Sequence, residues 1–228
     1  MCVVTAGRGE HTLTEEVYRV IRSELLSGAY KPGAPLRVPA LRERFSVSMS
    51  VIREALIRLS EQGLLTALPK QGFRVRALSL EDLEDLTNLR ILVETRALET
   101  SIERGDSRWE GDVLSAHHVL QSTPPSEGVA TGTSPEWDAA HATFHDTLVA
   151  ACGSPRLIEF TRKLRDSAEV YRQLAASASS YEERGVALEH RNLMDATLAR
   201  DTEAAVALLS GHLQKTCDAV VAGGGLGS

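Results

Sequence analysis

The segment that most constrains the fold runs from Ser48 to Leu65 and reads SMSVIREALIRLSEQGLL. After a short polar start, apolar side chains recur at i, i+3, i+4 and i+7, the spacing that gathers them on one buried face of a helix. Gly63 follows at the place where a left-handed residue commonly ends a helix. The segment therefore predicts one amphipathic helix with a defined start and end. Its apolar positions are Ile52, Ala55, Leu56 and Leu59.

The residues on both sides of this helix predict a winged helix-turn-helix. Upstream, Val38–Arg44 is long enough for a short helix and Ser46-Val47 for a turn. Downstream, Leu64–Leu68 and Phe73–Ala77 are short extended runs that form the expected wing. In this arrangement the second helix lies in the DNA major groove with its N-terminal residues toward the bases. The alternative is a helical hairpin with a β-ribbon that binds a protein or has no partner.

Charge is distributed unevenly along the 228 residues, whose formal net charge is −6. Residues 1–78 contain 12 Lys and Arg against 7 Asp and Glu, whereas the remainder contains 13 against 24. A basic front and an acidic back suit a DNA-reading domain joined to one that does not touch DNA. Three widely spaced cysteines give no disulfide framework, which favours a reducing cytoplasm. No apolar run approaches the ~18 residues of a membrane helix, and the first residues lack a signal-peptide pattern.

The predicted fold class is mainly α, with two domains. We expect a flexible leader over 1–12, the winged helix-turn-helix over 13–78, an all-helical domain over 79–222 and a flexible tail over 223–228. No strand signal is found after Ala77, so the second domain is predicted to be an antiparallel bundle of about six helices.

Helix starts in the second domain are marked by capping residues. Ser79 opens a capping-box-like start, and Ser134-Pro135 and Ser154-Pro155 are pairs of an N-cap residue and a proline. The stretch Pro124–Ser134 is rich in small and polar residues, so an exposed loop is expected there. The last two helices are predicted near Tyr181–Ala199 and over Asp201–Ala222.

Four of the seven histidines lie on apolar faces of predicted helices. His141 and His145 share one stripe and are separated by one turn, about 6 Å along the axis. His190 and His212 lie ten or eleven residues on either side of a probable turn at Arg200-Asp201. An antiparallel hairpin brings these two imidazoles to the same level.

Buried imidazoles without partners cost free energy, and a divalent ion would satisfy all four. Helix-bundle cores are common places for such sites, so a metal site is predicted. The alternative is a hydrogen-bond network inside the bundle. The other histidines, His11, His117 and His118, are interpreted as leader or surface residues.

The chain resembles one family of bacterial transcription regulators over nearly its whole length. Leu13–Arg76 is similar to the winged-helix domain of the GntR family, and the back half is similar to the FCD effector domain of its FadR-like branch. In front, the matching pieces are Val47-Ser48, Ile52-Arg53-Glu54-Ala55-Leu56, Arg58-Leu59, Gly63-Leu64 and Gly72. Behind, they are Arg90 with Glu94, Phe144-His145, the turn Cys152–Leu157, Glu189-His190 and His212-Leu213.

The resemblance implies a metal set of one Asp or Asn and three histidines. His141 stands in the place of the acid, so the expected ligands are His141, His145, His190 and His212. An all-imidazole set favours zinc, nickel or copper over manganese or magnesium; we expect zinc, with nickel as an alternative. Asp138, one turn before His141, is a candidate hydrogen-bond partner behind the ligands.

The resemblance also implies a homodimer that reads a palindromic operator and holds a small-molecule effector in each bundle. A carboxylate of the effector would bind at an open position of the metal. Arg90 is the candidate second anchor, unless it is held in an ion pair with Glu94 one turn later.

The DNA-reading segment departs from the family pattern. Met49 stands where the family commonly has Arg, and Val51 where it has Pro or Thr, whereas the central Arg53 is retained. Because an Arg paired with guanine contributes strongly to specificity, an altered or relaxed operator is expected. Bases are expected to meet Ser48, Met49, Ser50 and Arg53, and phosphates or the minor groove to meet Lys70, Gln71, Gly72, Arg42, Arg44 and Lys31.

These expectations describe a repressor whose affinity for its operator is modulated by an organic acid bound near a metal. One alternative is a repressor for which the metal ion is itself the signal. A second is a metal-dependent hydrolase, although no general base with a matching geometry is visible and the DNA reader would be unexplained.

Overall fold

The computed structural model describes residues 12–26, 29–69, 71–76, 78–125, 133–178 and 185–223. The predictions for the leader before Thr12, the tail after Gly223, His11 and Lys70 lie outside these residues. The chain divides into two compact units, Met1–Leu78 and Ser79–Ser228, and each is described by itself.

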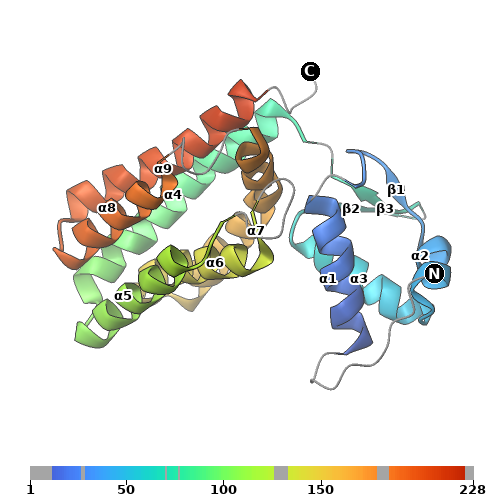
Figure 1. Cartoon of the computed structure of the whole chain (residues 1–228), viewed down its shortest axis with the longest axis horizontal. Coiled ribbons are helices and arrows are strands. Elements are labelled where there is room, and N and C mark those ends of the chain that lie inside the picture. Colours follow the sequence, from blue (N-terminus) through green and yellow to red (C-terminus); the bar gives the residue numbers. More distant parts are fainter. Residues whose placement is uncertain are drawn as a thin grey trace. The chain divides into compact units, whose positions relative to one another are not determined.

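The first unit is a winged helix-turn-helix, as predicted, and its described residues form three helices and a small antiparallel sheet (Figure 1). The strand order is β1-β3-β2, and Leu65 pairs with Val75 at the base of the wing. Strand β1 was not expected, because two residues are too short to show an alternating pattern. The elements are α1 (Leu13–Leu26), β1 (Pro35–Leu36), α2 (Val38–Phe45), α3 (Met49–Glu61), β2 (Leu65–Leu68) and β3 (Gly72–Val75).

Helix α3 begins and ends where the sequence indicates. The Ser48 hydroxyl accepts a hydrogen bond from the backbone N–H of Val51, which caps the helix start. Gly63 has φ +75°, the left-handed conformation that turns the chain toward β2. The predicted apolar stripe is completely buried and packs against α1. The core of this unit therefore fixes which face of α3 remains outside.

The second unit is an all-helical bundle with six α-helices in its described part, in agreement with the prediction (Figure 1). The long helices α4 and α9 lie side by side, and α5 and α6 pack on each other. No described helix has the length and apolar character needed to cross a membrane. The helices are α4 (Leu80–Arg104), α5 (Ser107–Ser122), α6 (Pro135–Val149), α7 (Pro155–Ala178), α8 (Val186–Leu198) and α9 (Thr202–Ala222).

Most helix starts follow the predicted caps. The hydroxyls of Ser79 and Ser134 accept backbone N–H groups of α4 and α6. Helix α8 starts at Val186 among the described residues, and the earlier start expected near Tyr181 lies outside them. Residues 126–132 of the expected exposed loop lie outside the described residues, and the expectation is wrong for Thr133 and Ser134, which are buried. They are buried because Thr133 hydrogen-bonds to side chains of α6 and α7.

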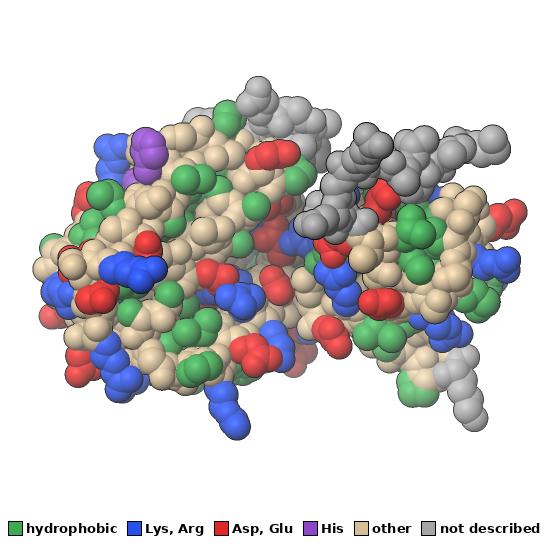
Figure 2. Space-filling model, turned by 90° about the horizontal axis from the view of Figure 1, so that it is seen from below, with side chains coloured by type: hydrophobic (Ala, Val, Ile, Leu, Met, Phe, Trp, Pro, Cys, Tyr) green, Lys and Arg blue, Asp and Glu red, His purple; other side chains and the backbone are tan. Residues whose placement is uncertain are grey.

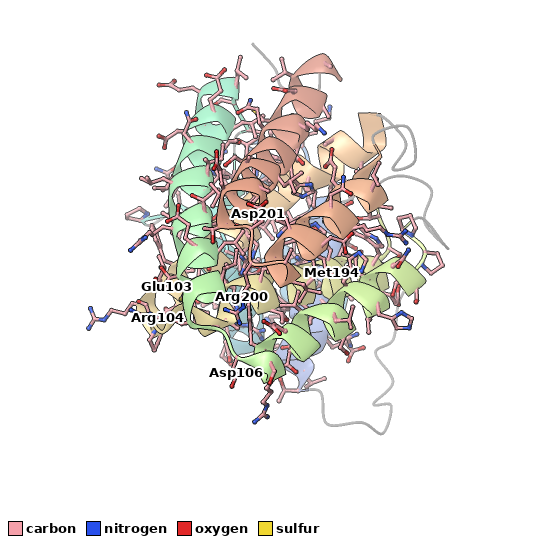
Figure 3. All side chains as sticks on the ribbon, turned by 90° about the vertical axis from the view of Figure 1, so that its left-hand side faces the viewer. Glu103, Arg104, Asp106, Met194, Arg200 and Asp201 are labelled. Atoms are coloured by element: carbon pink, nitrogen blue, oxygen red, sulfur yellow. The ribbon has the colours of Figure 1, made fainter. Side chains whose placement is uncertain are left out.

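A single arginine fastens the α8–α9 turn to the end of α4. Arg200 has φ +56°, and its guanidinium donates to the carbonyls of Ile102 and Gly105 at 2.7 and 2.6 Å. It also pairs with Glu110 on α5 at 2.7 Å. Figure 3 shows Arg200 and Asp201 at the same end of the bundle as the labelled end of α4. These contacts fix the position of the α8–α9 turn relative to the C-terminal end of α4.

One face of the bundle is mixed in charge. On the face shown on the left of Figure 2, acidic and basic side chains alternate with small groups of hydrophobic ones. Such a surface contrasts with the dense basic character expected of a face that follows DNA.

Candidate metal centre

Three helices bring the four predicted histidines into one cluster inside the bundle. His141 and His145 come from α6, His190 from α8 and His212 from α9. One ring nitrogen from each can be chosen so that all four lie within 4.8 Å of one another. The ring centroids of His141 and His145 are 4.5 Å apart, and those of His190 and His212 are 4.8 Å apart.

Local sequence explains this convergence. On α6, residues four apart face the same side, so the stripe of Trp137, Phe144 and Leu148 carries both histidines into the core. Helices α8 and α9 form an antiparallel hairpin around Arg200, which brings His190 and His212 to one level. The helical spacing on α6 and the α8–α9 hairpin thus bring the four histidines together.

Burial keeps the histidines on α6 neutral. Burial lowers the pKa of His145 well below 6.5, and the neighbouring His212 and His190 lower it further. Burial likewise lowers the pKa of His141, with His145 as the next cause. The Nε2 atom of His145 is buried and has no hydrogen-bond partner among the described residues. A neutral imidazole with an unsatisfied nitrogen is a group ready to bind an electrophile.

One histidine of the cluster is oriented by an acid behind it. The Nδ1 atom of His212 donates to the Glu189 carboxylate at 2.8 Å, and Lys215 binds the other carboxylate oxygen at 2.8 Å. Burial raises the pKa of Glu189, but the hydrogen bonds from His212 and Lys215 outweigh it and the pKa is lowered overall. Because Nδ1 faces Glu189, Nε2 of His212 is the nitrogen left for the cluster, an arrangement typical of metal-binding histidines.

The donor set fits a borderline divalent ion. Four neutral imidazoles are the nitrogen ligands that zinc, nickel and copper prefer, and no carboxylate joins them within the described residues. The buried nitrogen of His145 and the Glu189–His212 pair are the two features that a hydrogen-bond network among the imidazoles leaves unexplained. A bound ion would act as a Lewis acid that accepts an oxygen ligand from a small molecule.

A small pocket of about 20 Å³, with room for about one water molecule, lies next to the cluster, and one of the residues that line it is an arginine that the sequence analysis did not single out. Arg172 on α7 lies over the Trp137 ring at 4.9 Å, and Trp137 stacks on His141 with centroids 4.6 Å apart. Aromatic, cationic and hydroxyl groups therefore meet beside the imidazoles. The pocket is lined by Thr133, Trp137, His141, Arg172, Ala176, Val186, His212 and Thr216.

Arg172 is held by a buried polar network. Its guanidinium binds the carboxylates of Asp138 and Glu169 and the hydroxyl of Thr133, the last at 3.0 Å. Burial alone would lower the pKa of Arg172, but the two carboxylates raise it, so the guanidinium stays charged. Asp138, which we expected behind His141, instead binds Arg172, Thr133 and Gln173. The Asp138 carboxylate pairs with the Arg172 guanidinium because a buried carboxylate without a nearby cation is strongly destabilising.

Arg90 forms the ion pair with Glu94 that the sequence analysis gave as the alternative to a role as effector anchor. Its Nε donates to Glu94 at 2.7 Å, and Glu94 is only 1% exposed. Arg165 reaches the other oxygen of Glu94 at 3.4 Å and also binds Asp146. The positive charges of Arg165 and Arg90 are among the causes that lower the pKa of His145. The charge of Arg90 therefore acts on His145, while its guanidinium is held by Glu94.

The first unit exposes most of the residues expected to meet DNA. Ser48, Met49, Ser50 and Arg53 lie on the outer face of α3, and Arg42, Gln71 and Gly72 are exposed. Gly72 has φ +86°, which makes the tight turn at the tip of the wing. Arg44 differs, since its guanidinium is held by Glu24 and donates to the Tyr30 hydroxyl at 3.2 Å.

Two parts of the site were missed or misread. His117, read as a surface residue, is buried against Phe144 with ring centroids 5.6 Å apart, whereas His118 is exposed as expected. Arg172 was not singled out at all. The signal available was a charged residue beside the apolar positions Ala168, Tyr171 and Ala175 of one predicted helix, which marks an arginine directed toward the interior.

The structure defines a class of protein: a winged helix-turn-helix unit of the DNA-binding type joined to an all-helical unit with a histidine cluster. Residues 13–75 match the bacterial regulatory proteins of the gntR family, and residues 85–215 match the FCD domain. The chain belongs to the GntR family and is a transcriptional regulator with an FCD domain.

Similar proteins support this assignment. The chain is 32% identical to the HTH-type transcriptional repressor GlaR of Escherichia coli, over 86% of this chain and 90% of that protein. It is 33% identical to the HTH-type transcriptional regulator BphR of Paraburkholderia xenovorans, over 92% and 85% of the two chains. The solved structure of E. coli McbR/YncC has the same fold, with TM-score 0.72, 23% identity and coverage of 93% and 98%. The hydrolase alternative is therefore wrong, since these relatives are regulators.

Proposed function

We propose that this regulator is a cytoplasmic repressor that binds a palindromic operator as a homodimer and responds to a small carboxylate bound beside a divalent metal. The repressor role is supported by the name of its relative GlaR. The metal we propose is zinc, with nickel as the alternative. The observation that carries the proposal is the convergence of His141, His145, His190 and His212 inside the FCD unit.

The effector is proposed to bind in the pocket beside the histidines. The bound ion would hold one carboxylate, because the histidines supply no negative charge to balance it. Arg172 lines this pocket and would anchor a second acceptor group of the effector, together with the Thr133 hydroxyl, on condition that the effector widens the pocket and displaces Asp138 or Glu169 from the guanidinium. Arg90 remains a second candidate anchor, on condition that the effector displaces it from Glu94.

DNA contact is proposed for the outer face of α3 and the wing. Ser48, Met49, Ser50 and Arg53 would meet base edges, while Gln71, Gly72 and Lys70 would approach the minor groove or phosphates. Arg42 and Lys31 are exposed and would approach phosphates, whereas Arg44 is engaged by Glu24. An effector changes operator affinity only if it binds two dimer geometries unequally.

Metal content of untagged protein tests the centre of this proposal. After incubation with zinc and extensive dialysis, elemental analysis should find about one zinc ion per chain. His190→Ala should lose the ion, whereas His118→Ala, which removes an exposed histidine, should retain it. Circular dichroism should show both variants to be folded. Absence of stoichiometric zinc or nickel in the unaltered protein would contradict the proposed metal site.

The second arm of this experiment uses a panel of small mono- and dicarboxylates on the zinc-loaded protein. At least one acid should raise the melting temperature of the unaltered protein, since a ligand that binds only the folded state stabilises it. Arg172→Met should remove that shift while zinc stays bound. If zinc alone releases the operator and no acid does, the ion is the signal and the carboxylate part of the proposal is wrong.

A further inference from the structure

The outer face of the DNA-reading helix α3 carries an apolar side chain on either side of its arginine. Met49, Arg53 and Ile57 follow one another at four-residue intervals, so they form a line along the helix. Met49 is 41% exposed and Ile57 is 49% exposed. The adjoining face of α3, which contains Ile52 and Leu56, is completely buried and fixes this orientation.

The other polar groups near this line are already engaged. Ser48 caps the helix, and its hydroxyl lies 2.8 Å from that of Ser50. Arg58 is paired with Glu15 at 2.8 Å. Among the described residues, Arg53 has neither an ion pair nor a hydrogen bond from its side chain. The longest side chains free to reach a base from this face are therefore Met49, Arg53 and Ile57.

The chemistry of the major groove suggests what such a face recognises. An arginine there pairs with the acceptors of guanine, whereas the apolar group that bases present in this groove is the C5-methyl of thymine. A methionine or isoleucine laid against that methyl removes apolar surface from water and leaves no polar group unpaired. A cytosine at the same place would present a polar amino group instead, which an apolar side chain cannot satisfy.

We propose that Met49 and Ile57 read thymine methyl groups on either side of the base contacted by Arg53. The inference rests on the DNA contact surface proposed above and specifies what that surface selects. Each half of the operator would then hold thymines flanking a guanine. At the base that Met49 faces, the operator would carry a methyl group, whereas an arginine at residue 49 would select guanine there.

The test replaces thymine by uracil, which lacks only the methyl group. The full-length protein first selects its tightest fragment from a library of chromosomal DNA, and each thymine of both half-sites is then replaced in turn. Loss of one buried methyl contact should weaken binding about fourfold at the affected positions. Met49→Ala should bind the thymine and uracil forms equally at one position, and Ile57→Ala at another.

A matched control and a second variant keep the result interpretable. Leu13→Ala removes another exposed apolar side chain of the same unit and should keep the full uracil penalty. Met49→Arg should favour guanine at the position where Met49 favoured thymine. If the unaltered protein binds every uracil form as tightly as the parent, or if both alanine variants keep the penalty, the inference is overturned. Failure of the proposed DNA surface would show separately, as no binding to the unmodified fragment.

Discussion

Burial keeps the imidazole of His145 neutral, and it also makes the stability of the bundle depend on pH. Burial and neighbouring imidazoles lower the pKa of His145 and His141 far below the value of about 6.5 in an unfolded chain. Below about pH 6.5, these two histidines bind protons in the unfolded chain but remain unprotonated in the folded chain. The contribution to stability is therefore complete above about pH 6.5 and is lost as the pH falls.

For metal-free protein, we expect the free energy of unfolding to fall by about 1.4 kcal/mol per pH unit for each such histidine below pH 6.5. Urea unfolding between about pH 4.5 and 7.5 measures this slope. His145→Gln should make the slope shallower by the contribution of one proton. His118→Gln, which removes an exposed imidazole, should leave it as in the unaltered protein. Equal slopes for His145→Gln and the unaltered protein would refute this interpretation.

At the residue scale, sequence predicted the histidines better than their surroundings. Periodicity alone placed His141 and His145 inward, because helical spacing is encoded locally. The partners of Asp138 could not be read in this way, because Arg172 lies on a different helix far along the chain. A buried carboxylate binds the cation that tertiary packing brings nearest, and sequence spacing does not contain that distance. The burial of His117 could have been predicted locally, because His117 lies four residues after Val113 and three before Leu120 on the buried face of α5.

At the element scale, the α8–α9 hairpin depends on the clamp made by Arg200. Its guanidinium bonds two carbonyls at the end of α4, which would otherwise lack side-chain partners. Arg200→Ala should lower the free energy of unfolding by about 1–3 kcal/mol, since hydrogen bonds from a charged group contribute more than neutral ones. Chemical denaturation followed by circular dichroism measures the loss.

Two further variants separate the causes of this loss. Glu110→Gln removes only the exposed ion pair and should cost less than about 1 kcal/mol. Arg200→Gly also removes the guanidinium but relieves the left-handed backbone, so it should be more stable than Arg200→Ala by about 0.5–1 kcal/mol. A cost for Glu110→Gln equal to that of Arg200→Ala would show that the carbonyl contacts contribute nothing.

Elements were predicted well where caps and periodicity agree and poorly where pairing is long-range. Helix α3 has a serine cap, an apolar stripe and a terminal glycine, and all three are found. Strand β1 has none of these signals, because its two residues are extended only through pairing with β3. Its formation depends on contacts nearly forty residues away, which no local pattern reports.

At the scale of the whole molecule, the two units divide the work of a regulator. The first presents an exposed reading helix and a wing, and the second holds a buried imidazole cluster beside a pocket. Sequence resemblance supplied the joint function, whereas the place of Arg172 beside the histidines follows from the packing of α7 on the bundle. The fold thus follows largely from local patterns, and the chemistry of the pocket follows from tertiary packing.

The most direct test of the account is selection of chromosomal fragments by the purified full-length protein at about 0.15 M salt, followed by affinity measurement on the enriched fragments. The account predicts a small set of fragments that share an inverted repeat, each bound by two chains, with Arg53→Ala weakening binding at least about tenfold. Retention of chromosomal fragments no better than random DNA of equal length would contradict it.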